Sequence, residues 1–211
     1  MKIYKYHSIN INLLQSIRKQ ENWYSKLSLL NDPYECFFFD NTNSSVYREF
    51  LSTLAVCCFS KNRNEILMWS NYASNHTGVC LEFEVVGDEI LKGRLMDVDY
   101  DNEPLSLDTV ERTHTGHLSL HISKNGRFLK TKFKNWSYEQ EKRCYAFCDS
   151  DKMSGIAQPF LGPLTGVYFG KNASIDDIEL VKHNSIQLSK VKFFQVELDT
   201  STMKMDKLIS L

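Results

Sequence analysis

Two glutamates, Glu139 and Glu141, stand two residues apart immediately before an apolar segment, and Arg143 follows them. If a strand begins near Glu139, its alternation places these three side chains on one face, with neighbouring carboxylates about 6–7 Å apart. One carboxylate can then stabilise a developing cation or hold a hydroxyl, while the other orients or deprotonates the attacking group. The arginine would keep at least one of them ionised. The structural alternative is an ion pair at a sheet edge.

These glutamates close a basic and aromatic segment. Residues 124–143 carry seven basic and two acidic side chains, a net charge of +5, among four aromatic rings. Residues 61–123 carry five basic and eleven acidic side chains, a net charge of −6. Cations interleaved with rings suit a ligand that bears phosphates and bases. The alternative is a solvated face that neutralises the acidic segment before it.

A second candidate site follows Met68. Helical spacing places Trp69, Tyr72 and His76 on one stripe, and Gly78 ends that helix. The stripe predicts either the wall of a ligand cleft, with His76 as a proton donor, or part of the core. Ser60 lies outside any GxSxG elbow, so the sequence does not predict a hydrolase nucleophile there.

Other recognisable sites are absent from the sequence. His114, His117 and His121 have the spacing of one helix face, but no carboxylate or cysteine completes a ligand set and Gly116 weakens the helix. We therefore expect no metal. No Walker loop, GxGxxG turn or kinase signature is present either.

Strands and helices must position these candidates. Apolar alternation predicts strands over residues 2–7, 55–60, 78–84, 94–100, 141–148, 165–170, 191–199 and 203–209. Helices are expected after Asn10 and over residues 44–54, 65–73 and 174–183, and residues 108–133 look helical apart from two glycines. Without strict βαβ alternation, this order predicts an α+β fold. We expect one domain over residues 1–211, with a mixed, mostly antiparallel sheet of about eight strands and four or five helices.

Composition sets the class of protein. The 211 residues are 42% hydrophobic and 12% aromatic with a net charge of −1, which fits one globular domain and excludes disorder and coiled coil. The sequence has no secretory h-region and no apolar run of roughly 18 residues, so we expect a cytoplasmic protein without membrane contact. Its six cysteines should then be reduced, most of them as small buried side chains. Oligomeric state is not predicted.

Several short blocks, in order, resemble a bacterial family catalogued as domain of unknown function 2971. They are Tyr4-Lys-Tyr6, Asn31-Asp-Pro-Tyr-Glu35, Cys58-Phe-Ser60, residues 67–72, residues 76–83, Lys132, residues 136–143 and Phe169-Gly170. Tyr34 stands where the family usually has phenylalanine, and residues 105–123 match no pattern of the family.

The order of elements is also similar to that of ADP-ribosyltransferase-type folds. That resemblance implies cleavage of the nicotinamide–ribose bond of NAD through an oxocarbenium-like transition state. Glu141 would hold a ribose hydroxyl and stabilise the cation, Glu139 would orient the acceptor, and His76 would be a further catalytic candidate. The candidate binding residues are Tyr6 or His7 at the adenosine ribose, Trp69 or Trp136 on a ring, Lys132 and Arg143 near the pyrophosphate, and Asn31, Asp32, Ser60 and Tyr72 around them.

Two functions stay open. The first is a cytosolic NAD-using or nucleotide-modifying effector of a defence or toxin system, with a nucleotide-type small molecule as its ligand. The alternative is a nucleic-acid-binding module or nuclease-type effector that uses residues 124–143 without NAD chemistry. Whether the chain is an enzyme also stays open.

Overall fold

A ten-stranded, mostly antiparallel sheet forms the centre of the protein. The computed structural model describes residues 1–32, 52–85, 95–102, 110–112, 118–120, 127–148, 153–188, 190–202 and 204–211. The sheet confirms the α+β fold and has more strands than the eight expected. Its strands are β1 (Lys2–His7), β2 (Glu21–Lys26), β3 (Leu54–Ser60), β4 (Val79–Glu84), β5 (Leu95–Asp97), β10 (Glu141–Phe147), β11 (Gly155–Pro159), β12 (Leu164–Phe169), β13 (Lys192–Asp199) and β14 (Lys204–Ser210).

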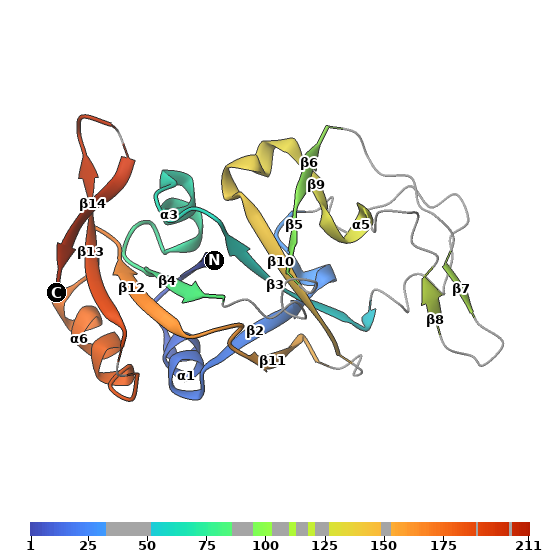
Figure 1. Ribbon diagram of the computed structural model, residues 1–211, viewed down its shortest axis with the longest axis horizontal. Helices are drawn as coiled ribbons and strands as arrows, with labels where there is room; N and C mark the ends of the chain where they lie inside the picture. Colours follow the sequence, from blue (N-terminus) through green and yellow to red (C-terminus); the bar gives the residue numbers. More distant parts are fainter. Residues whose placement is uncertain are drawn as a thin grey trace.

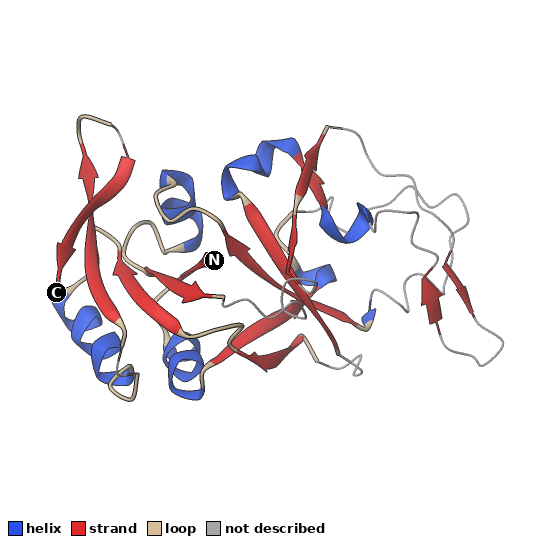
Figure 2. Cartoon of the chain, viewed as in Figure 1, coloured by secondary structure: helices blue, strands red, loops and turns tan. Residues whose placement is uncertain are grey.

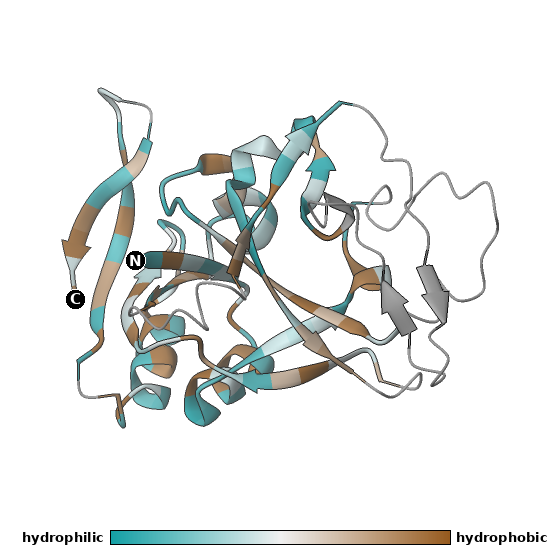
Figure 3. Ribbon diagram, turned by 45° about the vertical axis from the view of Figure 1, so that its right-hand side comes forward, coloured by the Kyte–Doolittle hydropathy of each residue, from teal (hydrophilic) through white to brown (hydrophobic). Residues whose placement is uncertain are grey.

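Strand order shows how the chain builds this sheet. The main path runs β11-β2-β3-β1-β4-β12-β13-β14, and β10 joins β3 on one side and β5 on the other. The pair β12–β13 is parallel, and the helix between these strands makes the crossover that a parallel pair needs. In Figure 3, β13 and β14 carry both hydrophilic and hydrophobic residues along their length.

Helices cover both faces of the sheet. Helices α1 (Ile11–Lys19) and α6 (Ile175–Asn184) pack on one face, where the largest apolar cluster lies, and α3 (Ile66–Tyr72) packs on the other (Figure 1). The Asn10 side chain accepts a hydrogen bond from the Leu13 amide (3.1 Å), and Ser174 caps α6 in the same way (3.1 Å). Figure 2 shows the same division, with α1 and α6 low in the view and α3 near the top.

β3 changes its neighbour partway along one edge. On that edge β2 pairs with β3 at Val56 and β1 pairs with it at Ser60. Cys58 lies between these two contacts, and its carbonyl accepts a hydrogen bond from the Lys5 ammonium (3.0 Å). The opposite edge pairs with β10 along its whole length. β1 and β2 therefore diverge from β3 and leave a fork in the sheet.

The helix expected over residues 108–133 is wrong. Its described parts form a hairpin of β7 (Val110–Arg112) and β8 (Leu118–Leu120), then the short helix α5 (Arg127–Lys130) and strand β9 (Thr131–Phe133). Threonine, valine and glycine in this segment are weak helix formers. His114, His117 and His121 lie outside the described residues, as does most of the helix expected over residues 44–54.

Two further boundaries differ from expectation. Residues 94–100 were expected as one strand, but β5 pairs with β10 while β6 (Asp99–Asp101) pairs with β9. Between them the Val98 amide donates to the Glu141 carbonyl (3.0 Å). Helix α3 ends at Tyr72, and Ser74, Asn75 and His76 all adopt positive φ angles. His76 is therefore not on the helical stripe.

The cysteines of the described residues form no disulfide. All five cysteines in the described part of the chain are free thiols, and Cys57, Cys80, Cys144 and Cys148 are buried. Among the described residues, no helix combines the length and the apolar character that crossing a membrane requires.

The Asn10 cap gives a first prediction. Asn10→Ala should lower the free energy of unfolding by about 1 kcal/mol, because the Leu13 amide loses its partner at the start of α1. Urea denaturation measures the change. Asn12→Ala, at an exposed position inside the same helix, is the control and should not destabilise the protein. Equal losses in both variants would contradict the cap.

Candidate functional site

A cavity of about 200 Å³ lies at the fork of the sheet. It takes side chains from β1, β2 and β3, from α3, and from the segment that carries the two glutamates. Its lining residues are Tyr4, Lys5, Tyr6, Trp23, Ser25, Leu30, Asn31, Val56, Cys58, Phe59, Ser60, Met68, Tyr72, Lys132, Glu139 and Glu141.

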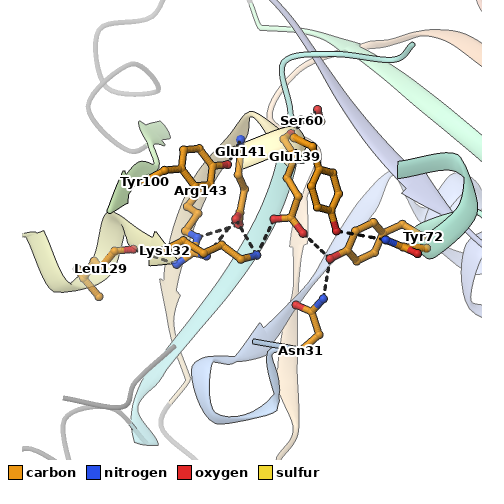
Figure 4. Close-up of polar contacts among 11 residues, drawn as sticks. Asn31, Ser60, Tyr72, Tyr100, Leu129, Lys132, Glu139, Glu141 and Arg143 are labelled. Atoms are coloured by element: carbon orange, nitrogen blue, oxygen red, sulfur yellow. Dashed lines mark hydrogen bonds and ion pairs between the residues drawn. The ribbon is translucent and has the colours of Figure 1, made fainter. Parts of the chain in front are cut away.

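The two glutamates meet across a turn. Glu139 ends the 3₁₀ helix η2 (Lys134–Glu139), Gln140 adopts a left-handed conformation (φ 44°), and β10 begins at Glu141. The strand expected over residues 141–148 is confirmed, but Glu139 precedes it, so strand alternation does not relate the two glutamates. The Lys132 ammonium of β9 bridges the two carboxylates, 2.6 Å from Glu139 Oε2 and 3.3 Å from Glu141 Oε2 (Figure 4).

Arg143 holds Glu141 from the other side. Its Nε donates to Glu141 Oε1 (2.8 Å) and its Nη2 donates to Glu141 Oε2 (3.0 Å). Glu141 and Arg143 face Ser60 and Cys58 directly across the β3–β10 pair. All four groups of the chain Glu139–Lys132–Glu141–Arg143 are buried. The ion pairs of the structural alternative are therefore present, but they do not lie at a sheet edge, since β10 is flanked by β3 and β5.

Tyr72 connects Glu139 to the surface. Its hydroxyl donates a short hydrogen bond to Glu139 Oε1, and Asn31 Nδ2 donates to the same hydroxyl (2.6 Å). A tyrosine hydroxyl has one proton, so the donation from Asn31 directs that proton to Glu139. On the main chain, the Ser60 hydroxyl donates to the Glu139 carbonyl (2.6 Å).

The surroundings shift the pKa values of the two carboxyls in opposite directions. Burial raises the pKa of Glu139, and the donations from Lys132 and Tyr72 only partly offset it. Burial also acts on Glu141, but Arg143 and Lys132 outweigh it and lower the pKa of that carboxyl to about 2. Glu141 therefore stays ionised, while Glu139 is the carboxyl that more readily takes a proton.

The structure brings eight of the thirteen sequence-predicted site residues together. Seven line the cavity and Arg143 lies directly behind Glu141: Tyr6, Asn31, Ser60, Tyr72, Lys132, Glu139, Glu141 and Arg143.

Five other candidates lie outside the lining of the cavity. Trp69 is 0% exposed in the core, where its indole Nε1 donates to the Arg63 carbonyl (2.8 Å). Trp136 is half-buried, with its ring centroid 4.9 Å from the Lys132 ammonium. His7 and Asp32 are also absent from the lining, as is His76, whose carbonyl accepts from the Asn172 amide (3.0 Å).

Part of the basic segment is engaged in ion pairs with the acidic one. Lys130 pairs with Asp99 (2.9 Å) and Lys142 pairs with Asp97 (2.9 Å). Lys132 and Arg143 contact the glutamates described above. The pairs with Asp99 and Asp97 agree with neutralisation of the acidic neighbour, but Lys132, Lys142 and Arg143 are buried and form no solvated face.

Sequence reasoning missed several residues of the cavity. Lys5, Trp23 and Cys58 line it, and the Tyr100 hydroxyl accepts a hydrogen bond from the Glu141 amide (2.8 Å). The alternation of residues 2–7 could have indicated Lys5. Trp23 lies on a strand that was not predicted, and nothing local marks Tyr100. Within the described residues, no cluster of side chains with metal-binding geometry occurs.

Comparison with known proteins gives one match. Residues 68–144 match the family model described as protein of unknown function (DUF2971). This part of the chain contains Tyr72, Lys132, both glutamates and Arg143, and it is similar to that family as the sequence blocks indicated. No curated protein and no solved structure matches the chain.

The link between Tyr72 and Glu139 gives a second prediction. Tyr72→Phe should raise the pKa of Glu139, because the ionised carboxylate loses a hydrogen-bond donor. A ¹³C NMR titration of the glutamate carboxyls measures it. Tyr138→Phe is the matched control. The Tyr138 hydroxyl accepts a hydrogen bond from Asn71 Nδ2 (3.2 Å) and bonds neither carboxylate. An unchanged Glu139 titration in Tyr72→Phe would contradict the link.

Glu141 gives a prediction about stability. Glu141→Gln should lower the free energy of unfolding at pH 7 by about 3 kcal/mol, because Arg143 and Lys132 lose a buried counter-charge. The pKa of Glu141 in the folded protein lies below the ordinary 4.5. The wild type should therefore lose the stability that ionised Glu141 provides as pH falls from 4.5 towards 2. Urea denaturation at pH 7 and pH 3 measures both effects. Glu197→Gln breaks an exposed pair with Lys207 and should change little. An equal difference in unfolding free energy between wild type and Glu141→Gln at both pH values would contradict the lowered pKa of Glu141.

Proposed function

We propose that the protein binds a nucleotide-type ligand at the fork of the sheet and breaks the ligand's N-glycosidic bond, with NAD as the first candidate substrate. The observation that carries this proposal is the pair of carboxylates on one cavity wall whose pKa values are shifted in opposite directions. Such a split is typical of sites in which one carboxyl exchanges a proton and the other supplies a fixed charge.

Each carboxyl then has its own task. Glu141 stays ionised, holds a ribose hydroxyl and stabilises positive charge that develops at the anomeric carbon. Glu139 orients the acceptor and takes its proton, and Lys132 and Tyr72 hold this carboxylate in place. Arg143 fixes the rotamer of Glu141 through two hydrogen bonds.

The proposed reaction balances without a further reagent. The bond between the anomeric carbon and the nicotinamide nitrogen breaks, and its electron pair leaves with neutral nicotinamide. Water or an acceptor hydroxyl forms the new bond to the anomeric carbon and gives its proton to Glu139. The transition state has the oxocarbenium character that carboxylates stabilise in glycosidases.

The remaining walls support a ligand with flat rings. Tyr4, Tyr6, Trp23 and Tyr72 supply aromatic faces, and Ser25 and Ser60 supply hydroxyls. A volume of about 200 Å³ is below the ~300–1,000 Å³ of ordinary ligand sites. The enclosed part would therefore be one ring or sugar of the ligand, with the remainder along the mouth.

The wider assignment rests on the sequence. An ADP-ribosyltransferase-like activity rests on the resemblance stated from the sequence alone, and an NAD-consuming activity would suit an effector in a defence or toxin system. The competing nucleic-acid function has less support, because Lys130 and Lys142 pair with aspartates of the same chain.

Release of nicotinamide from NAD tests the proposal. The wild-type protein should release it, and Glu139→Gln should lower the rate by about 100-fold or more while the fold remains, since glutamine mimics the protonated carboxyl. Glu82→Gln is the matched control. It replaces another buried carboxylate, held by Lys2, Thr165 and Tyr168 outside the cavity, and should retain activity. No release by the wild type, or equal rates in wild type and Glu139→Gln, would overturn the proposal.

A further inference from the structure

Lys5 is a cation of the cavity that the proposed reaction does not use. It lies on β1, between β3 and β4 in the middle of the sheet, and its side chain lines the cavity at the fork. A lysine at a central strand position needs a reason, because its ammonium must keep polar partners when it leaves water.

The close partners of Lys5 are neutral. Its ammonium donates to the Cys58 carbonyl (3.0 Å), also bonds the buried Cys57 thiol, and lies 5.4 Å from the centroid of the Phe59 ring. The two other cations of the site differ, since Lys132 and Arg143 both contact carboxylates. Glu141 acts on Lys5 only at longer range, and both of its oxygens already accept hydrogen bonds from Arg143 or Lys132.

We propose that Lys5 binds an anionic oxygen group of the ligand, a phosphate or a carboxylate. The inference rests on the proposed function only in taking this cavity as the ligand site. A bound anion would supply a counter-charge in direct contact, where Glu141 acts on Lys5 only at longer range. An ammonium has three donors, and the bonds to the Cys58 carbonyl and the Cys57 thiol leave one for a charge-assisted hydrogen bond to a ligand oxygen.

The fork explains how a ligand can reach this ammonium. β2 pairs with β3 at Val56 and β1 pairs with it at Ser60. At Cys58, between these two contacts, the β3 carbonyl bonds the Lys5 side chain instead of a neighbouring strand. Trp23 and Ser25 of β2 line one side of that point, and Tyr4 and Tyr6 of β1 line the other. The anion would therefore lie between the two diverging strands, with aromatic rings beside it.

Two pairs of small molecules separate phosphate from carboxylate recognition. ADP-ribose and adenosine differ in their phosphates and terminal ribose, and nicotinate and nicotinamide differ in a carboxylate. Calorimetry on the full chain, without turnover, gives the affinity of each for wild type, Lys5→Met, Lys5→Arg and Lys2→Met. Lys2 is the matched control, because it stands on the same strand but pairs with Glu82 outside the cavity (2.9 Å).

The wild type should prefer the anionic member of at least one pair, by about tenfold or more. Lys5→Met should lose that preference, and Lys5→Arg and Lys2→Met should keep it. The inference is overturned if neither pair is distinguished or if Lys5→Met, shown by its melting curve to be folded, keeps the preference. An anion preference that depends on Lys5 without nicotinamide release would instead overturn the proposed reaction alone.

Discussion

The Lys132 ammonium between two buried carboxylates is the interaction on which the rest of the site depends. It joins β9, the end of η2 and the start of β10 at one point, and each of these segments reaches it by a different path. Removal of Glu141 from this contact would be costly, because Lys132 and Arg143 would lose a shared counter-charge in a poorly polarisable interior. The contact therefore fixes the relative positions of β9, η2 and β10. It also fixes which carboxyl is free to exchange a proton.

The sheet imposes a second constraint, the divergence of β1 and β2 from β3. A continuous antiparallel sheet would fill this space with hydrogen-bonded backbone and leave no room for a ligand. Because β3 changes partners between Val56 and Ser60, side chains from both strands face a common space. On its other edge β3 pairs fully with β10, which holds Glu141 and Arg143 in register with Ser60 and Cys58. One strand thus gives the cavity its opening and its rigid wall.

Local patterns predicted the elements that local interactions determine. The cap Asn10 was readable, because its side chain bonds an amide three residues away. The alternation of β1, β4 and β10 was readable because each has an apolar face. β2 was not, since its residues Asn22, Trp23 and Ser25 have no clear alternation and its partner β11 lies more than a hundred residues later in the chain.

The site likewise contains residues that sequence spacing could identify and contacts that it could not. Glu139, Glu141 and Arg143 could be singled out from spacing alone, although the geometry that joins them depends on the left-handed Gln140 and not on strand alternation. Tyr72 bonds Glu139 from 67 residues away, and Tyr100 bonds the Glu141 amide from 41 residues away. Such contacts exist only in the folded chain, so a sequence pattern cannot supply the protonation behaviour that follows from them.

The central place of β1 has a consequence for the order in which the protein can fold. β1 precedes both of its partners in the chain and pairs along its length with β4 and at one point with β3, so it must wait for later segments before it gains a partner. The cavity closes only after β10 has been made and has joined β3. A nascent chain that stops before that strand would carry the aromatic walls but would lack Glu141 and Arg143. The complete cavity would therefore form only after most of the chain had been translated.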